Sequence, residues 1–400
     1  MDLQYAAVML RQMRISNRLP ASLLPTAFSM LVEARREAPE FLDLTVSNPT
    51  QCGFDFAEGA WTPALASEEV LRYKADPCGS LPARVAIATH HGCGVHPEDI
   101  LLTASTSEAY SWLFKLLCDP GDQVLVPSPS YPLFEHLAAL EGIETVNISA
   151  YFHERWCSDI TALESACGPR TRAIVVVNPN NPSGQFLSIG EWKDLAALCA
   201  TRDLALLVDE VFADFALEPA VDSLRTALLD GDPPCPVFVL SGLSKVALLP
   251  QVKLGWILLR GKARACLEPL AFLADQYLSV SASAQAVAAT ALLAAPARRT
   301  KVLDRAHDNL ICLDEFLKEY PHLSRLPVEG GWSVLLRRPV YHGADDVACA
   351  KRLLEETSVL VHPGSFFDLP MEGYLVLSLL TPPRNFREGL SRILPRLPVD

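Results

Sequence analysis

Short apolar runs alternate with longer helix-like segments through the middle of the chain. The apolar runs lie at residues 100–103, 123–127, 145–148, 174–177, 206–208, 237–240 and 255–259. Residues 107–117 and 131–141 lie between runs and have the spacing of apolar positions expected of helices that cover a sheet. This strand–helix alternation predicts an α/β fold with a mostly parallel sheet in an α/β/α sandwich.

The last third of the chain predicts a smaller α+β domain. An alanine-rich stretch at 281–295 predicts a long buried helix that ends at Pro296, because proline lacks the backbone N–H that a helix needs. Beyond Pro296 the pattern predicts two helices and three strands, at residues 305–320 and 344–357 and at residues 333–336, near 359 and near 376.

These patterns divide the chain into three parts. Residues 1–45 form an N-terminal segment that packs on the small domain or on a partner subunit. Residues 46–275 form the large domain, and residues 276–400 form a linker helix and the C-terminal small domain.

The composition favours a cytoplasmic enzyme over a nucleic-acid-binding or membrane protein. The net charge is −13 with no basic block, and no apolar run is long enough to cross a bilayer. The first residues lack the basic start and apolar core of a signal peptide. Eleven cysteines are scattered singly without a CxxC pair, which is typical of reduced thiols. Nine histidines show no metal-ligand spacing, and His90 and His91 are predicted to be a pair on a helix surface.

Polar residues follow three of the predicted strands at the point where each ends. Asn181 lies in the turn 178–184, Asp209 follows the run at 206–208, and Lys245 follows the run at 237–240. Ligand sites in parallel sheets lie at the carboxyl ends of the strands. An amide, a carboxylate and an amine delivered to that edge suit the binding of pyridoxal phosphate (PLP), with the lysine as its Schiff-base partner.

Each of these residues also has an ordinary interpretation. Lysines at strand ends are usually solvated. Asp209 can cap a following helix instead of keeping the pyridine nitrogen of PLP protonated, and Glu210 is the more typical capping or surface carboxylate. The turn that contains Asn181 is rigid, because it holds two prolines and a glycine, and it can present one amide to the ring oxygen of PLP or serve as a plain turn.

Hydroxyl groups and a cation are available for the phosphate of such a cofactor. Ser105, Thr106 and Ser107 stand at a predicted strand-to-helix turn, where backbone N–H groups attract anions, although hydroxyls there are often simple helix caps. Lys253 can return a positive charge to the same pocket. Tyr131 can stack on the cofactor ring or pack in the core.

Together these motifs resemble the class I/II aminotransferases, which are fold-type I PLP enzymes, from about residue 43 to residue 393. The resemblance is carried by Asn-Asn-Pro-Ser-Gly at 180–184, Asp-Glu-Val-Phe at 209–212, and Ser-Lys at 244–245 followed by Lys-Leu-Gly-Trp at 253–256. Weaker matches are Ser-Asn-Pro at 47–49, Tyr73 with Gly79, and Glu-Gly-Gly-Trp at 329–332.

The resemblance implies a role for each matching residue. Lys245 would be the Schiff-base lysine and Asp209 the partner of the pyridinium, while Asn181 would hold the ring oxygen and Tyr131 would stack. The phosphate would be held by Thr106, Ser107, Ser244 and Lys253, with Ser105 nearby and Tyr73 reaching in from the neighbouring subunit of a homodimer. Ser47, Asn48 and Trp332 would contact the substrate.

Four positions depart from the family pattern. Phe212 replaces a tyrosine that contacts the ring oxygen, so the pKa of the imine should rise. Gly242 replaces a phosphate-binding serine, for which Ser241 can compensate. Lys253 replaces an arginine and gives up bidentate geometry. Val376 stands where the family has the arginine that clamps the substrate carboxylate.

Without that clamp, an α-carboxylate needs another partner. Arg384 in the next loop is one candidate, although a surface position is its ordinary interpretation, and Ser47 and Asn48 are others.

The sequence therefore predicts a PLP-dependent aminotransferase that acts on an amino acid or related small amine and a keto acceptor by ping-pong transamination. A PLP-dependent decarboxylase, lyase or tailoring enzyme of the same fold would use the same ring contacts. A regulatory or scaffolding protein with this fold is a third possibility. Nucleic acid, membrane and metal are not expected partners.

Overall fold

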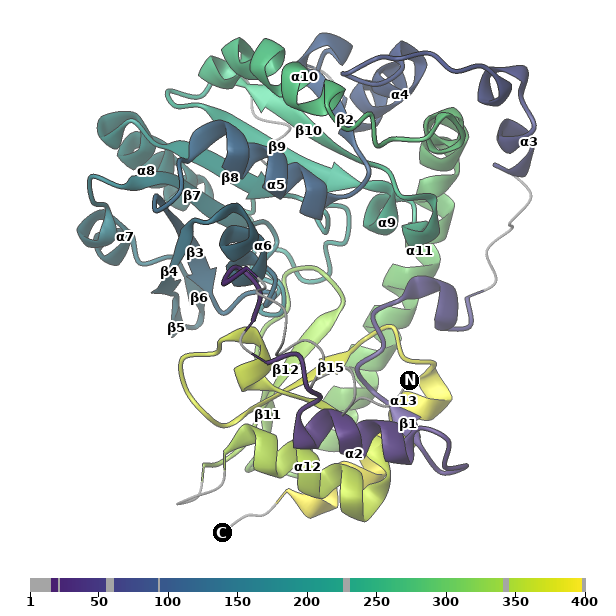
Figure 1. Cartoon of the computed structure of the whole chain (residues 1–400). Helices are drawn as coiled ribbons and strands as arrows, with labels where there is room; N and C mark the ends of the chain where they lie inside the picture. Colours follow the sequence, from purple (N-terminus) through teal and green to yellow (C-terminus); the bar gives the residue numbers. More distant parts are fainter. Residues whose placement is uncertain are drawn as a thin grey trace.

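Seven strands form the central sheet of the structure, a computed structural model that describes residues 16–20, 22–54, 61–92, 94–225, 231–340 and 345–397 (Figure 1). The strand order is β2-β10-β9-β8-β7-β3-β4, and only β10 runs antiparallel to its neighbours. The bounds are β2 (Ile100–Thr103), β3 (Gln123–Ser128), β4 (Glu144–Ser149), β7 (Thr171–Val177), β8 (Ala205–Asp209), β9 (Val237–Gly242) and β10 (Gly255–Arg260). All seven predicted strands are present, and the mostly parallel sheet is confirmed.

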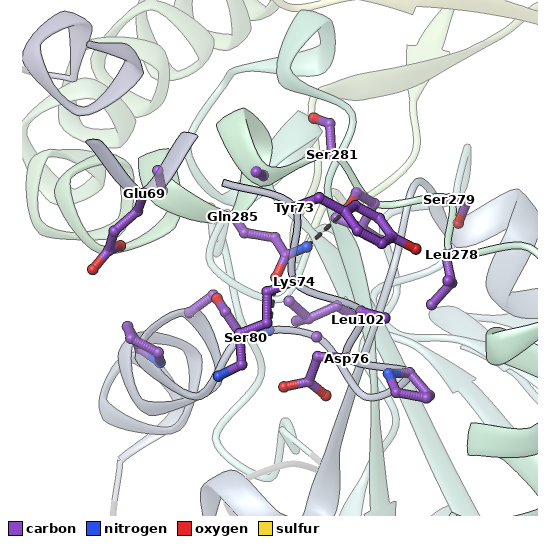
Figure 2. A pocket seen from close by; sticks show the side chains of 18 of the residues that line it. Glu69, Tyr73, Lys74, Asp76, Ser80, Leu102, Leu278, Ser279, Ser281 and Gln285 are labelled. Carbon is purple, nitrogen blue, oxygen red and sulfur yellow. Dashed lines mark hydrogen bonds between the residues drawn. The ribbon is translucent and has the colours of Figure 1, made fainter. Parts of the chain in front are cut away.

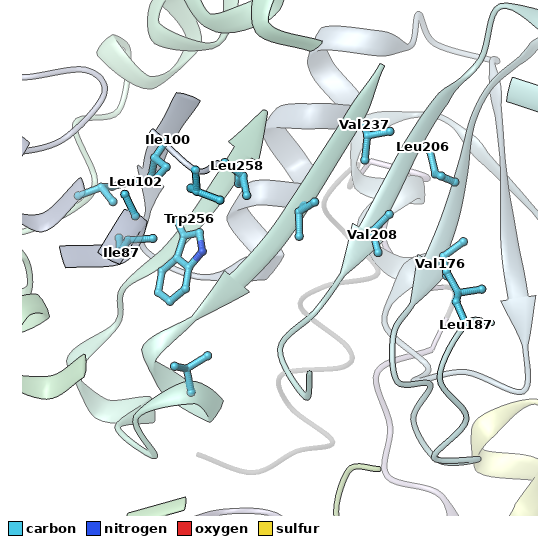
Figure 3. Packing of buried hydrophobic residues seen from close by; sticks show 14 of the residues in the cluster. Ile87, Ile100, Leu102, Val176, Leu187, Leu206, Val208, Val237, Trp256 and Leu258 are labelled. Atoms are coloured by element: carbon cyan, nitrogen blue, oxygen red, sulfur yellow. The ribbon is translucent and has the colours of Figure 1, made fainter. Parts of the chain in front are cut away.

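Helices cover both faces of this sheet, which explains why its inner strands β7, β8, β9 and β10 are mainly apolar. Along β9, Val237 and Val239 pack into a cluster under α4 (Leu81–His91), α8 (Ile189–Arg202) and α11 (Ala282–Leu317). Phe238 and Leu240 pack on the other face under α5 (Thr106–Leu117), α6 (Phe134–Glu141) and α10 (Leu267–Asp275). Figure 3 shows part of the first cluster, in which Trp256 of β10 is fully buried. This region also contains the helices α3 (Thr62–Leu65), α7 (Ile160–Ala166) and α9 (Leu243–Val246).

One continuous helix, α11 (Ala282–Leu317), joins the two halves of the molecule, so the predicted helix end at Pro296 is wrong. Proline in a helix removes one hydrogen bond and costs about 3 kcal/mol. Here the helix buries Ala291 and Leu292 against the central sheet before the proline and Leu310 and Leu313 in a second core after it. Burial on both sides outweighs the local cost. In the described part of the chain, neither this helix nor any other is long and apolar enough to cross a membrane.

A four-stranded sheet forms the second half, with the order β11-β12-β15-β14. Its strands are β11 (Ser324–Arg325), β12 (Ser333–Arg337), β14 (His362–Pro363) and β15 (Tyr374–Ser378). The helices α12 (Asp346–Thr357) and α13 (Pro383–Ile393) pack on it with the end of α11. The predicted start of α12 at residue 344 lies outside the described residues. A separate hairpin of β5 (Tyr151–His153) and β6 (Arg155–Cys157) lies in sequence between β4 and β7 of the central sheet.

The N-terminal segment packs on this second half. Helix α2 (Ala27–Arg35) places Phe28 in the core of the small sheet, with its ring 5.6 Å from the ring of Phe366. Strand β1 (Leu42–Asp43) pairs in parallel with β13 (Val359–Leu360). The domain limits proposed from the sequence, at residues 45 and 275, stay a prediction.

A buried ion pair fixes the start of β15. The fully buried carboxylate of Asp346 accepts hydrogen bonds from the guanidinium of Arg338 at 2.6 Å and from the backbone N–H groups of Gly373 at 2.9 Å and Tyr374 at 3.2 Å. Removing one partner of such a pair leaves an uncompensated buried charge. Asp346 therefore holds the strand that carries Val376 in its place.

We predict that Asp346→Ala lowers the free energy of unfolding by about 3–5 kcal/mol, because the buried guanidinium of Arg338 loses its carboxylate. The matched control is the neighbouring Asp345→Ala, which removes only the exposed helix cap that accepts from the N–H of Ala348 and should cost about 1 kcal/mol. Urea denaturation measures both. Equal losses in the two variants would contradict the assigned role of Asp346.

Candidate active site

A cavity of about 300 Å³ opens at the carboxyl ends of the central strands and reaches the small sheet. Its lining includes most of the predicted site residues: Ser47, Thr106, Ser107, Tyr131, Asn181, Asp209, Phe212, Ser244, Lys245 and Trp332. The large half supplies the helix starts and strand ends, and the small half supplies residues of β12, β14 and β15.

Asp209 ends β8 and is almost completely buried. Its carboxylate accepts hydrogen bonds from the hydroxyl of Tyr110 and from the N–H of Val211, both at 3.1 Å. Burial raises the pKa of Asp209 to about 6, although these two hydrogen bonds and the charge of Lys245 oppose the rise. A turn and not a helix follows Asp209, so the helix-cap interpretation is wrong.

Lys245 lies in the short helix α9 and points its amine at two aromatic rings. The Nζ atom is 4.7 Å from the ring centre of Trp332 and 5.4 Å from that of Phe212. These two rings contact each other edge to face, with their centres 4.8 Å apart. Burial lowers the pKa of Lys245 to about 8, against the opposing effect of Asp209. The amine is therefore much more nucleophilic near neutral pH than a solvated lysine.

Of the three asparagines in the turn after β7, only Asn181 lines the cavity. The amide of Asn178 is buried and donates to the carboxylate of Glu210 at 3.1 Å, and that of Asn180 donates to the backbone of Pro129 at 3.0 Å. These bonds hold the turn rigid and leave the Asn181 amide available to a ligand. Glu210 is itself buried, so its prediction as a capping or surface carboxylate is wrong.

The N-terminus of α5 opens into the same cavity through Thr106 and Ser107. Ser105 is its cap, because the serine hydroxyl accepts the N–H of Glu108 at 3.2 Å, and its side chain does not line the cavity. The first N–H groups of a helix lack partners within the helix and attract anions. Together with Ser244, this end of the cavity suits a phosphate group.

Besides Ser105, five predicted residues lie outside the cavity. Ser241 is buried with its hydroxyl 3.5 Å from the carbonyl of Glu210, and Lys253 is exposed in a left-handed turn. The carboxamide of Asn48 accepts the N–H of Thr50 at 3.1 Å. The remaining two are Arg384, exposed at the start of α13, and Tyr73.

The packing around Gly242 leaves little room for a side chain at this position. A Cβ atom at this position would lie 3.0 Å from the carbonyl oxygen of Leu254 and 3.2 Å from the Cα of Gly255. Because consecutive residues of a strand point to opposite faces of the sheet, the side chain of Ser241 cannot replace a serine side chain at position 242.

Tyr73 lies at a second cavity of about 460 Å³, between the 69–83 segment and the start of α11 (Figure 2). Its side chain is 85 % exposed. Gln285 braces this region by accepting the N–H of Ser80 at 2.6 Å and donating to the carbonyl of Val280 at 2.8 Å. Within one chain, Tyr73 is therefore separate from the cavity that holds Lys245.

Among the lining residues that the sequence reasoning missed are Tyr110 and His362. Tyr110 stands four positions after Thr106 on α5, a helical spacing that could have been noticed. His362 had no comparable signal, because only the pairing of β14 with β15 places it beside Val376 in the cavity wall.

A buried charge cluster joins the loop after Asp209 to the helix of Lys245. The carboxylate of Asp214 lies 2.8 Å from the guanidinium of Arg299, which also donates to the carbonyl of Val246 at 3.3 Å. The ring of His90 lies 3.2 Å from the same carboxylate, and His91 accepts the indole N–H of Trp256. His91 is buried and the side chain of His90 is only 9 % exposed, so their prediction as a surface pair is wrong.

We predict that Lys245 is methylated faster than the exposed Lys193 by formaldehyde and cyanoborohydride at pH 7 in the cofactor-free protein. An amine with a pKa of about 8 is deprotonated roughly 300 times more often at this pH than one at 10.5. Peptide mass spectrometry follows both sites, and Lys193 is the internal control. A slower reaction at Lys245 than at Lys193 would contradict the lowered pKa.

Comparison with known proteins agrees with this geometry. Residues 55–393 match the family of class I and II aminotransferases. The chain is 28% identical to alanine aminotransferase of Mycobacterium tuberculosis over 369 residues, which cover 89% of this chain and 85% of that protein. The structure of alanine aminotransferase from Pyrococcus furiosus superposes with a TM-score of 0.83 at 26% identity, over 96% of this chain and 99% of that one. A mutant aspartate aminotransferase of Thermus thermophilus gives a TM-score of 0.82 at 27% identity, over 96% and 100%.

These matches confirm the predicted fold type and enzyme class. The relatives are all aminotransferases, so the decarboxylase or lyase alternative gains no support. This family generally depends on PLP. The chain belongs to the class I and II aminotransferases and is a transaminase.

Proposed function

We propose that the cavity at the sheet edge binds PLP and transfers an amino group between a small amino acid or amine and a keto acid. The observation that carries the proposal is the joint placement of Asp209, Lys245 and Asn181 in one cavity. A buried carboxylate, an amine of lowered pKa and an unoccupied amide match the ring nitrogen, aldehyde and phenolic oxygen of PLP.

Each part of the cofactor has a suitable group in the structure. The start of α5 with Thr106 and Ser107, together with Ser244, would hold the phosphate. Tyr131 lines the cavity and is half exposed, so its ring is available to stack on a planar ligand. Lys253 stays a candidate for a second phosphate contact, because it lies two residues before Gly255, which packs against the backbone of Ser105.

The side chains divide the chemical work. Bound PLP supplies a ring that withdraws electrons from the substrate carbon. Asp209 would keep the ring nitrogen protonated, supported by the Tyr110 hydroxyl. Lys245 would hold the cofactor in the resting enzyme and then move the proton at the substrate Cα, for which a pKa near 8 is well suited.

We also propose that the enzyme works as a homodimer and in the cytoplasm. The support for the dimer is the segment beside the second cavity, where Tyr73, which lines the cavity, is 85 % exposed and Leu71, two residues earlier, is 84 % exposed. Large exposed apolar side chains grouped at a cavity mark a contact surface. A second copy placed here would cover Tyr73 and bring it to the phosphate of the other subunit. The cytoplasmic location rests on the scattered single cysteines.

We predict that added PLP gives a visible absorbance band in the wild-type protein and none in Lys245→Ala. Asp209→Asn should keep a band but reduce transamination by about 10²-fold or more, because the ring nitrogen loses its buried anion. Spectra recorded without an amino donor measure cofactor binding, and spectra recorded with a donor measure transamination. An unchanged band in Lys245→Ala would contradict the proposal.

The shared active site makes a separate prediction. Mixing Lys245→Ala chains with Tyr73→Ala chains should restore about a quarter of wild-type activity, because half of the dimers would be hybrids with one intact site. The matched control mixes Lys245→Ala with Asp209→Ala, whose changes fall in one cavity and leave no intact site in any hybrid. Equal activity in the two mixtures would contradict the sharing of Tyr73.

A further inference from the structure

We propose that His362 binds the α-carboxylate of the amino-acid substrate. This inference rests on the proposed PLP-dependent function and names the substrate class of the same site. It follows from three features of the cavity: its charged groups, the position of β14, and the packing of the histidine ring.

Positive charge is scarce in the cavity wall. Among the described residues that line it, only Lys245 and His362 can carry a positive charge, and Asp209 is the only carboxylate. Most other lining side chains are aromatic, aliphatic or hydroxyl-bearing. Since Lys245 is required at the substrate amine, His362 is the remaining group that can donate a hydrogen bond and take up a positive charge beside an anionic substrate group.

The hydroxyl groups on the same side offer less to a carboxylate. Ser378 donates its proton to the backbone carbonyl of Val46, and Thr45 donates to the carboxylate of Asp43 at 2.6 Å. Arg384, the candidate predicted from the sequence, is exposed and does not line the cavity. Val376, at the position of the family's arginine, is buried and apolar.

Strand pairing places His362 where it can replace that missing arginine. His362 of β14 is directly opposite Val376 of β15 in an antiparallel register, and both residues line the cavity. Opposite residues in such a pair lie about 5 Å apart. The histidine therefore reaches the same part of the wall from the neighbouring strand.

The ring of His362 is held by its neighbours. Its centre is 6.0 Å from the ring of Phe366 and 5.7 Å from that of Phe367. Burial lowers the pKa of the imidazole and the carboxylate of Asp43 acts in the opposite direction. A bound substrate carboxylate would add to the effect of Asp43 and favour the protonated ring.

The inference is tested by the binding of two probes, one charged and one uncharged, to the PLP-loaded enzyme. The probes are 3-phenylpropanoate and its amide, 3-phenylpropanamide, which differ only in the carboxylate. We expect His362→Phe to raise the dissociation constant of the carboxylate probe by about 10- to 100-fold and to change that of the amide probe by less than about threefold. His362→Arg should restore binding of the carboxylate, and His136→Gln, on the exposed side of α6, is the control. Titration calorimetry gives each dissociation constant.

Kinetics provide a second measurement. With L-phenylalanine as donor, His362→Phe should raise KM more than it lowers kcat, whereas with phenethylamine, which has no carboxylate, both constants should stay within about threefold of the wild type. If His362→Phe does not fold, His362→Gln supplies the comparison.

The outcomes separate this inference from the proposed function. A wild-type protein that gives no visible band with PLP contradicts the proposed function. If the PLP band is normal but His362→Phe loses the same affinity for both probes, or no affinity for either, the role of His362 alone is overturned. A wild-type enzyme that does not bind 3-phenylpropanoate overturns it as well.

Discussion

Two opposite charges, the buried carboxylate of Asp209 and the largely enclosed amine of Lys245, lie in one cavity, and the rest of the active site is arranged around them. Burying an ionisable group is unfavourable unless other groups compensate. Tyr110 and the N–H of Val211 stabilise the carboxylate, and the aromatic face of Trp332 receives the amine. The same burial that opposes charge brings both pKa values toward neutrality, which suits acid–base catalysis.

The site depends on contacts between the two halves of the molecule. Helix α11 packs on both cores, and its Arg299 binds Asp214 in the loop after Asp209 as well as the carbonyl next to Lys245. The small sheet then closes the cavity from the other side with Trp332 and His362. The surroundings of the Lys245 amine therefore depend on how the two halves pack together.

Much of the central sheet could be predicted from the sequence, because most of its strands are buried on both faces and are therefore mainly apolar. The site motifs were visible for a related reason, since polar residues directly after apolar strands stand out. The helix through Pro296 was mispredicted because tertiary burial outweighed a local preference. His90 and His91 were misplaced because their partners, Asp214 and Trp256, are distant in sequence.

The sequence by itself determined the family, the sheet and the three groups at the strand ends, Asn181, Asp209 and Lys245, because these depend on local pattern and order. Only the tertiary structure decided which hydroxyls face the cavity, that Ser105 is a cap, and that His362 lies opposite Val376. Those properties arise from strand register and from packing between distant segments. A local sequence pattern does not specify either of them.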